Sequence, residues 1–403
     1  MNWKIKGTNN LKKNRVKIKY NFKFTFIIFL IAIIIGLFLW KYNKNEDIII
    51  GFSAQLTGSQ AELGVQERNG VQLAIENINE SGGICGRKVS LLVKDDCGTS
   101  EMAKKGDEEL INSGAVAIIG HATTAQTLEG LKVTNPNKVV MLGATVSTPE
   151  LTGIDDYFFR IHPSFKNGAE SFVEHIYDYN KIKNIAVIYD TDNLSYAKTY
   201  ARIFGDKFKD MGGKVVSEIP FSSEVQPDFT PLLSILQKSK PEGVLIVASD
   251  IDTAIIAQRS KFIDKNIKLY AASWAQTETL ISNGGQAVEG MEIEQAYDIT
   301  NKSQNFVDFK SKYKVRFGDE ASFGASYSYE ATMVLAEALK KANCNKDKLK
   351  EALLETHDFN GIIDKITIDK FGDVERPYYI SKISNGKFNM VNELTSDNPG
   401  GEK

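Results

Sequence analysis

The chain of 403 residues is poor in cysteine and histidine, with three Cys and four His. Three cysteines are too few for the disulfide framework of a small secreted domain. No Cys-x2-Cys pair occurs and no histidine lies near a cysteine, which excludes a zinc module with the usual ligand spacing. The strand-like run 88–94 between Cys85 and Cys97 would span about 20 Å. This span favours free thiols, although a Cys85–Cys97 disulfide stays open.

Signatures of common enzymes are also missing. The sequence has no Gly-x-Gly-x-x-Gly, Walker A, His-Glu-x-x-His or Gly-x-Ser-x-Gly motif. No obvious nucleophile lies near His121 or His162 in sequence, so no catalytic residue, metal site or cofactor is predicted. One enzyme hypothesis stays open. Two Asp-x-Asp triplets follow apolar runs, at 190–192 and 250–252, and such pairs hold a divalent metal in membrane-anchored glycosyltransferases.

Charge is distributed unevenly along the chain. Residues 1–45 hold ten Lys or Arg and no acid, whereas the rest holds 39 basic and 51 acidic side chains. An acidic body argues against nucleic acid as a partner.

The uncharged segment 24–40 has 17 residues, about 25 Å as a helix, which is enough to cross a thin bilayer. The basic residues before it predict that 1–23 is a cytoplasmic tail and that the body is extracytoplasmic. Lys41 follows directly, with no small-residue cleavage site and no lipidation Cys. An uncleaved membrane anchor is therefore favoured over a removed signal peptide.

From residue 47 onward, short apolar runs alternate with helix-length segments. Continuous rather than alternating runs are typical of strands buried on both faces of a parallel sheet. The expected strands are 48–52, 89–93, 116–119, 139–142, 185–189, 244–247, 269–272 and 291–293. One expected helix carries apolar residues from Val71 to Ile78 and is closed by 79–83. The others are 101–112, 168–180, 195–211, 229–239, 252–264, 303–316 and 326–342. This alternation predicts an α/β protein with two doubly wound sheets. Near the end, 362–368, 378–383 and 387–391 are expected strands, and 394–403 a loose tail.

The loops that follow the expected strands carry the candidate site. In the first half they are dense in Ser, Thr and Gly, with Thr123, Thr124, Thr145 and Ser147 among them. Hydroxyls and free amides at a helix start suit a carboxylate. Ordinary capping and turn chemistry is the alternative for any single loop.

In the second half, other side chains follow the expected strands and could face those hydroxyls across a cleft. An acid or carbonyl there would match an ammonium group, and aromatic rings would match a side chain. The candidates are Tyr196, Ser249, Asp250, Ser273 and Trp274.

Several short motifs occur in a fixed order from about residue 48 to about residue 390. They include Leu56-Thr57-Gly58, Gly82-Gly83-Ile84, Asp95-Asp96, Gly120-His121, Pro149-Glu150-Leu151-Thr152 and Asp228-Phe229-Thr230. In this order the chain resembles the leucine/isoleucine/valine-binding family of type I periplasmic binding proteins, which serve ABC transporters. The resemblance implies two lobes joined by three crossovers, with ligand bound between them and a hinge that closes. Lobe 1 would hold 47–162 and 297–364, and lobe 2 would hold 163–296 and 365–393.

The resemblance also assigns roles to individual residues. It implies that Thr124, with Thr123 beside it, holds the ligand carboxylate. The positions of Thr145 and Ser147 would supply a backbone carbonyl to the ammonium, and an amide and hydroxyl to the carboxylate. Tyr196 would supply the aromatic ring of the family's site.

Three departures from the family pattern stand out. The second family tyrosine is Ser249 here, and the acid that holds the ammonium falls near Ser273 or Trp274, neither of which is acidic. Two alternatives stay open: Asp250 replaces that acid, or the ligand lacks an ammonium. The family's first-lobe disulfide would join Cys97 to the position of Thr123, so it is missing.

The sequence thus predicts a membrane-tethered, extracytoplasmic binding protein for a small carboxylate, foremost an amino acid. Its partner would be an ABC permease, with a sensor kinase or chemoreceptor as the alternative. It would perform no chemistry.

Overall fold

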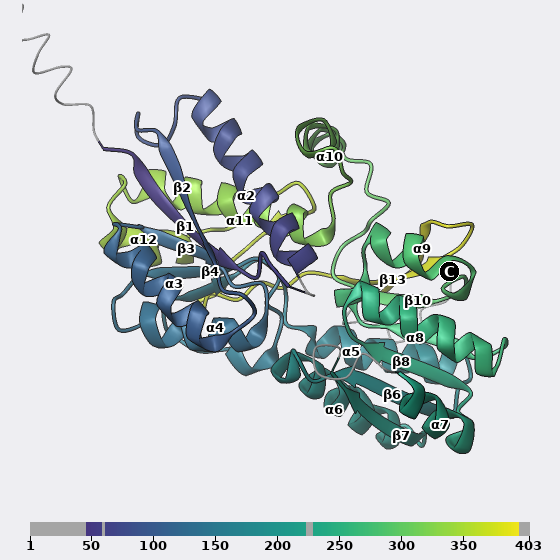
Figure 1. The fold of residues 1–403 in the computed structure, drawn as a ribbon. Coiled ribbons are helices and arrows are strands. Elements are labelled where there is room, and N and C mark those ends of the chain that lie inside the picture. The colour runs from purple at the N-terminus through teal and green to yellow at the C-terminus, as the bar shows by residue number, and fades with distance from the viewer. Residues whose placement is uncertain (1–45, 59–60, 223–228, 395–403) are drawn as a thin grey trace, which may run out of the picture. The chain divides into compact units, whose positions relative to one another are not determined.

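The computed structural model describes residues 46–58, 61–222 and 229–394 (Figure 1). The predicted cytoplasmic tail 1–23 and membrane anchor 24–40 lie outside these ranges, as does 395–403 of the predicted loose tail. Within the described ranges, no helix is both long and apolar enough to cross a membrane.

Five parallel strands form the sheet of lobe 1, in the order β2-β1-β3-β4-β5. Every residue of the two strands β3 and β4 is buried, as their continuous apolar sequences predict. The strands are β1 (Ile48–Ala54), β2 (Val89–Asp95), β3 (Ala117–Gly120), β4 (Val140–Gly143) and β5 (Phe158–Arg160).

Helices from two distant parts of the chain cover this sheet. Helices α2 and α11 pack closely at Gly70. A Cβ atom at this position would lie only 2.2 Å from the carbonyl oxygen of Ala325. Only glycine allows that approach. The helices of lobe 1 are α2 (Ala61–Glu80), α3 (Ser100–Asn112), α4 (Thr124–Thr134), α10 (Gln304–Phe317), α11 (Phe323–Lys341) and α12 (Leu349–Leu354).

Seven strands form the sheet of lobe 2, in the order β14-β13-β10-β9-β8-β6-β7. Strands β13 and β14 are antiparallel additions, and the other five are parallel. The strands are β6 (Asn184–Asp190), β7 (Lys214–Phe221), β8 (Gly243–Val247), β9 (Lys268–Ala271), β10 (Glu292–Gln295), β13 (Tyr378–Ile383) and β14 (Phe388–Leu394). The helices are α5 (Phe165–Glu174), α6 (Leu194–Asp210), α7 (Thr230–Ser239), α8 (Asp250–Ile263) and α9 (Glu278–Gly284).

The chain passes between the two lobes three times. It leaves the first sheet after β5, returns after β10 to helices α10–α12, and enters lobe 2 again at β13. Residues of α10, α11 and α12 belong to the hydrophobic core of the first sheet, which shows that this late segment is part of lobe 1.

All eight predicted apolar strands of the parallel sheets overlap observed strands, but β5 and β7 were not predicted. Strand β5 has three residues, too few to give a periodic signal. Strand β7 lies at the sheet edge and is mostly exposed or half-buried, so it lacks a continuous apolar run. The predicted strand 362–368 is largely wrong. The structure has only the two-residue strand β12 (Lys365–Ile366) there, paired with β11 (Phe359–Asn360), and an isolated bridge from Ile368 to Val374.

The cysteines differ from both sequence-based expectations. Cys85 forms a disulfide with Cys344, across a Cα separation of 6.6 Å, and Cys97 is a free, exposed thiol. The Cys85–Cys97 disulfide is therefore wrong, and the free-thiol prediction holds for Cys97 alone. The two bridged cysteines are 259 residues apart, and they meet because Cys85 follows α2 while Cys344 follows α11. The spacing of the cysteines along the sequence does not indicate that these two helices pack together.

Candidate functional site

A pocket with about 380 Å³ of empty volume lies between the lobes, where loops leave the carboxyl ends of strands in both sheets. We call it the ligand pocket. Open parallel sheets place their ligands at this edge. The lining residues are Leu63, Ala122, Thr123, Thr124, Thr145, Val146, Ser147, His162, Asn193, Tyr196, Ser273, Trp274 and Phe323.

The structure brings seven of the nine predicted site residues together in this pocket. They are Thr123, Thr124, Thr145, Ser147, Tyr196, Ser273 and Trp274. The other two, Ser249 and Asp250, line an adjoining pocket of about 360 Å³.

On the lobe 1 side, the ligand pocket is formed by the start of α4. Thr123 is the N-cap residue of this helix, but its side chain makes no capping hydrogen bond and contacts Gln126 instead. The first amides of α4 are therefore not used by the cap, and the helix dipole adds a partial positive charge there. This arrangement suits an anion, and the hydroxyl residue Thr124 lies at the same point, 2% exposed.

A buried carboxyl group supports the second hydroxyl loop of lobe 1. The Thr145 hydroxyl lies 3.1 Å from the Ala122 carbonyl oxygen and is also hydrogen-bonded to Glu67. Glu67 is fully buried, and burial raises its pKa to about 8. At pH 7 its carboxyl group is therefore mainly neutral. The network contributes polarity without placing a negative charge behind the pocket.

On the lobe 2 side, aromatic rings and one amide face the pocket. Tyr196 packs edge-on against Trp274 and Phe165, with ring centroids 5.9 and 5.2 Å away. Asn193 is the N-cap residue of α6 and also makes no capping hydrogen bond. Its Oδ1 atom is buried and has no hydrogen-bond partner among the described residues. A buried acceptor without a partner is costly, so this oxygen is a candidate ligand contact.

His162 and Asn193 line the ligand pocket although neither was predicted as a site residue from the sequence. His162 follows β5, the short strand that gave no signal, and its Nδ1 lies 2.8 Å from the Pro163 carbonyl oxygen. Burial, with the positive charges of Arg160 and Arg376, lowers its pKa to about 4, so the ring is neutral at pH 7. Asn193 follows the Asp-x-Asp triplet 190–192 and precedes Tyr196, and these neighbours, rather than Asn193 itself, were the predicted residues of this loop.

No Asp, Glu, Lys or Arg lines the ligand pocket in the described part of the chain. The described residues also contain no group of three or more His, Cys, Asp or Glu that could hold a metal ion. In the Asp-x-Asp triplets, Asp190 accepts from the amide of Asp192 and Ser249 bonds to Asp252, which is local loop and cap chemistry.

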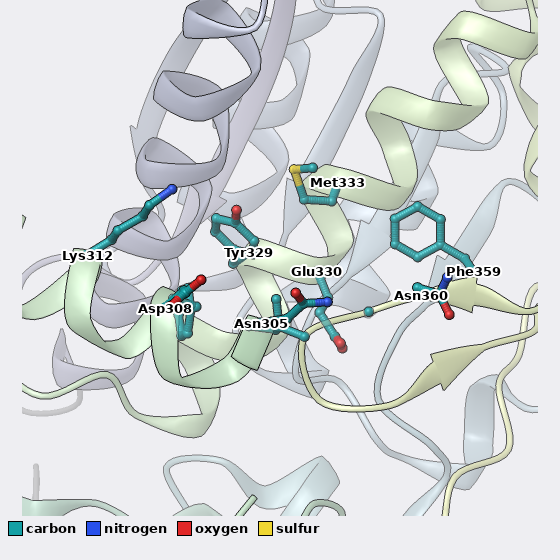
Figure 2. Close-up of a pocket in the computed structure, with 11 residues that line it drawn as sticks. Asn305, Asp308, Lys312, Tyr329, Glu330, Met333, Phe359 and Asn360 are labelled. Atoms are coloured by element: carbon teal, nitrogen blue, oxygen red, sulfur yellow. The ribbon is translucent and has the colours of Figure 1, made fainter. Parts of the chain in front are cut away.

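Another pocket, of about 700 Å³, lies within lobe 1 and contains none of the predicted site residues (Figure 2). Asp308 and Lys312 of α10 face Tyr329 and Met333 of α11 across it. Its buried acid, Glu330, is already paired with Arg376 at 2.8 Å. This pocket shares no lining residue with the ligand pocket.

The family model for periplasmic binding proteins matches residues 47–387. The chain belongs to the periplasmic binding protein family. This confirms the sequence-based family prediction and the two-lobed α/β fold. The family consists of solute-binding proteins rather than enzymes, which argues against the glycosyltransferase hypothesis.

Individual relatives align with most of this chain. The Leu/Ile/Val-binding protein homolog 1 of Brucella suis biovar 1 is 25% identical over 364 residues, covering 86% of this chain and 94% of the relative. The crystal structure of a leucine binding protein from Thermotoga maritima MSB8 has a TM-score of 0.80 and 24% identity, covering 87% of this chain and 99% of that one. A solute binding protein from Rhodopseudomonas palustris BisB5, in complex with 3,4-dihydroxybenzoic acid, has a TM-score of 0.77 and 23% identity, covering 86% and 97%.

Glu67 makes the stability of the protein depend on pH. Its pKa is about 8 in the folded chain against 4.5 as an ordinary carboxyl, so the folded state holds an extra proton between these values. Folding stability therefore falls as pH rises through this range. Glu67→Gln removes this titration. We expect the free energy of unfolding of the variant, minus that of the parent, to increase by about 1 kcal/mol per pH unit from pH 5 to 8.

Urea unfolding at several pH values measures this difference. Glu80→Gln, at an exposed position of the same helix, is the control and should give no such trend. A Glu67→Gln advantage that does not change with pH would contradict the buried, neutral carboxyl group.

Proposed function

We propose that this protein captures a small carboxylate, specifically an amino acid, outside the cytoplasm and delivers it to an ABC permease. The observation that supports this most is the meeting of the predicted hydroxyl residues and the unused α4 amides in one inter-lobe pocket. The names of the Brucella and Thermotoga relatives point to branched-chain amino acids as ligands of those proteins. An ABC transporter is the stated context of the Rhodopseudomonas neighbour.

The carboxylate would bind at the start of α4. Its oxygens would accept from the first amides of the helix and from the hydroxyls of Thr124 and Ser147, which are 2% and 4% exposed. Each hydrogen bond to a charged group contributes about 1.5–3 kcal/mol. A few such contacts are enough for micromolar affinity, which corresponds to about −8 kcal/mol.

The α-ammonium would bind without a carboxylate partner. Asn193 Oδ1 is buried and has no hydrogen-bond partner among the described residues. It would accept a hydrogen bond from the ammonium in place of the family's acid. The Thr145 carbonyl is the second acceptor that the family resemblance supplies. Neutral acceptors hold an ammonium less strongly than a carboxylate does, so the carboxylate end provides most of the affinity.

Binding and hinge closure are coupled in this proposal. The hydroxyl loops belong to lobe 1, whereas Asn193, Tyr196 and Trp274 belong to lobe 2. A ligand that contacts both sides stabilises the form in which the lobes meet, because only that form makes both sets of contacts. The closed form is what a permease would recognise.

The body would be tethered to the membrane by segment 24–40, with residues 1–23 in the cytoplasm. The support is the uncharged length of that segment and the basic residues before it. The full chain should stay in the membrane fraction after an alkaline carbonate wash. Release of an intact chain into the supernatant would contradict the tether.

The carboxylate site is tested by removing its hydroxyls. A thermal-shift screen of the amino acids, followed by calorimetry, identifies the ligand because a compound that binds only the native state raises the melting temperature. We expect Thr124→Ala with Ser147→Ala to weaken binding of that ligand at least about tenfold.

The matched control removes two exposed hydroxyls, Ser81→Ala with Ser113→Ala, and should leave the dissociation constant unchanged. Unchanged affinity in the Thr124 and Ser147 double variant would refute this location for the carboxylate.

A further inference from the structure

The pocket that adjoins the ligand pocket differs from it in chemistry. We call it the acidic pocket. It is lined by Glu62, Leu63, Gln66, Ser249, Asp250, Trp274, Thr277, Ser322 and Phe323. The residues common to both pockets are all hydrophobic, namely Leu63, Trp274 and Phe323. A molecule that occupies both would have one polar end in each pocket and an apolar part between them.

Asp250 is the dominant group of the acidic pocket. It is 5% exposed, its Oδ2 accepts from the Thr277 hydroxyl at 2.5 Å, and its Oδ1 accepts from the Ile251 amide at 2.8 Å. Both donors are neutral, and Asp250 forms no ion pair within the described residues. A buried carboxylate without an opposite charge is unfavourable. Each oxygen also keeps a lone pair with which it could accept another hydrogen bond.

Lobe 1 contributes a second acid to the same pocket. Glu62 lies in the first turn of α2, where its Oε1 accepts from Gln66 Nε2 at 3.1 Å. No Lys or Arg of the described chain lines either pocket. Two carboxylates from opposite lobes repel each other across the cleft unless a cation lies between them.

We infer that the amino acid bound by this protein carries a positive charge at the end of its side chain, as lysine, ornithine and arginine do. This inference rests on the proposed function. In this binding mode the carboxylate and α-ammonium, which share one carbon, occupy the ligand pocket, and the side chain extends past the hydrophobic residues common to both pockets toward Asp250. The aliphatic part of the side chain lies among Leu63, Trp274 and Phe323, and its cation binds Asp250 and Glu62.

An apolar side chain would fit this arrangement poorly. Its end would cover Asp250, remove water from that carboxylate and offer no hydrogen bond in return. The acidic pocket therefore selects against leucine-like ligands as well as for cationic ones, which is how binding sites discriminate most strongly.

Lysine and norleucine test the inference, because norleucine has the same straight side chain without the terminal ammonium. Calorimetry on the full chain purified in detergent compares the two amino acids, with arginine as a second cation. We expect lysine or arginine to bind at least about tenfold more tightly than norleucine. Equal binding of norleucine overturns the inference while leaving the proposed function intact. No binding of any amino acid would overturn both.

Variants then locate the effect. Asp250→Asn keeps the side-chain shape without the charge, and should reduce the preference for the cation by weakening lysine binding and strengthening norleucine binding. Asp264→Asn, at an exposed position that ends α8, should keep the preference. A cation preference that survives in both Asp250→Asn and Glu62→Gln would show that another group provides it, and would overturn the assignment.

Discussion

A helix N-terminus whose amides are left free by its own cap residue is the feature on which the ligand pocket depends. Thr123 starts α4 without capping it, so the partial positive charge of the helix end faces the pocket rather than a side chain of the same turn. The parallel sheet places this end beside the other post-strand loops of lobe 1. A carboxylate can therefore be held without a Lys or Arg, neither of which lines the pocket in the described chain.

The loop that carries Thr123 is held by a buried ionic group. His121 lies between Asp96 at 2.7 Å and Asp107 at 3.1 Å, all three buried. Burial alone would lower the His121 pKa, but the charges of Asp107 and Asp96 raise it to about 10, so the imidazole is protonated at neutral pH. This group joins the β3–α4 loop to α3 and to the loop after β2, which fixes the start of α4. The protonated His121 therefore supports this loop without lining the ligand pocket, whereas His162, which lines the pocket, is neutral.

Continuous apolar runs allowed most of the parallel strands to be predicted from sequence, because burial on both faces leaves a local signature. The elements that were missed have none: β5 is three residues long, and β7 is an edge strand with few buried residues. Seven of nine candidate site residues share one pocket because the ends of parallel strands meet at one sheet edge. His162, Asn193 and the Cys85–Cys344 disulfide depend on contacts between distant segments, which a single sequence does not encode locally.

The central claim is that one amino acid is held by both lobes, with its carboxylate at the start of α4. A crystal structure of the protein with its tightest-binding amino acid tests this most directly. The account predicts ligand carboxylate oxygens within hydrogen-bonding distance of the Thr124 amide and the Ser147 hydroxyl, and contacts from Asn193 and Trp274 on the opposite lobe. A ligand held by one lobe alone, for example in the lobe 1 pocket of Figure 2, would contradict it.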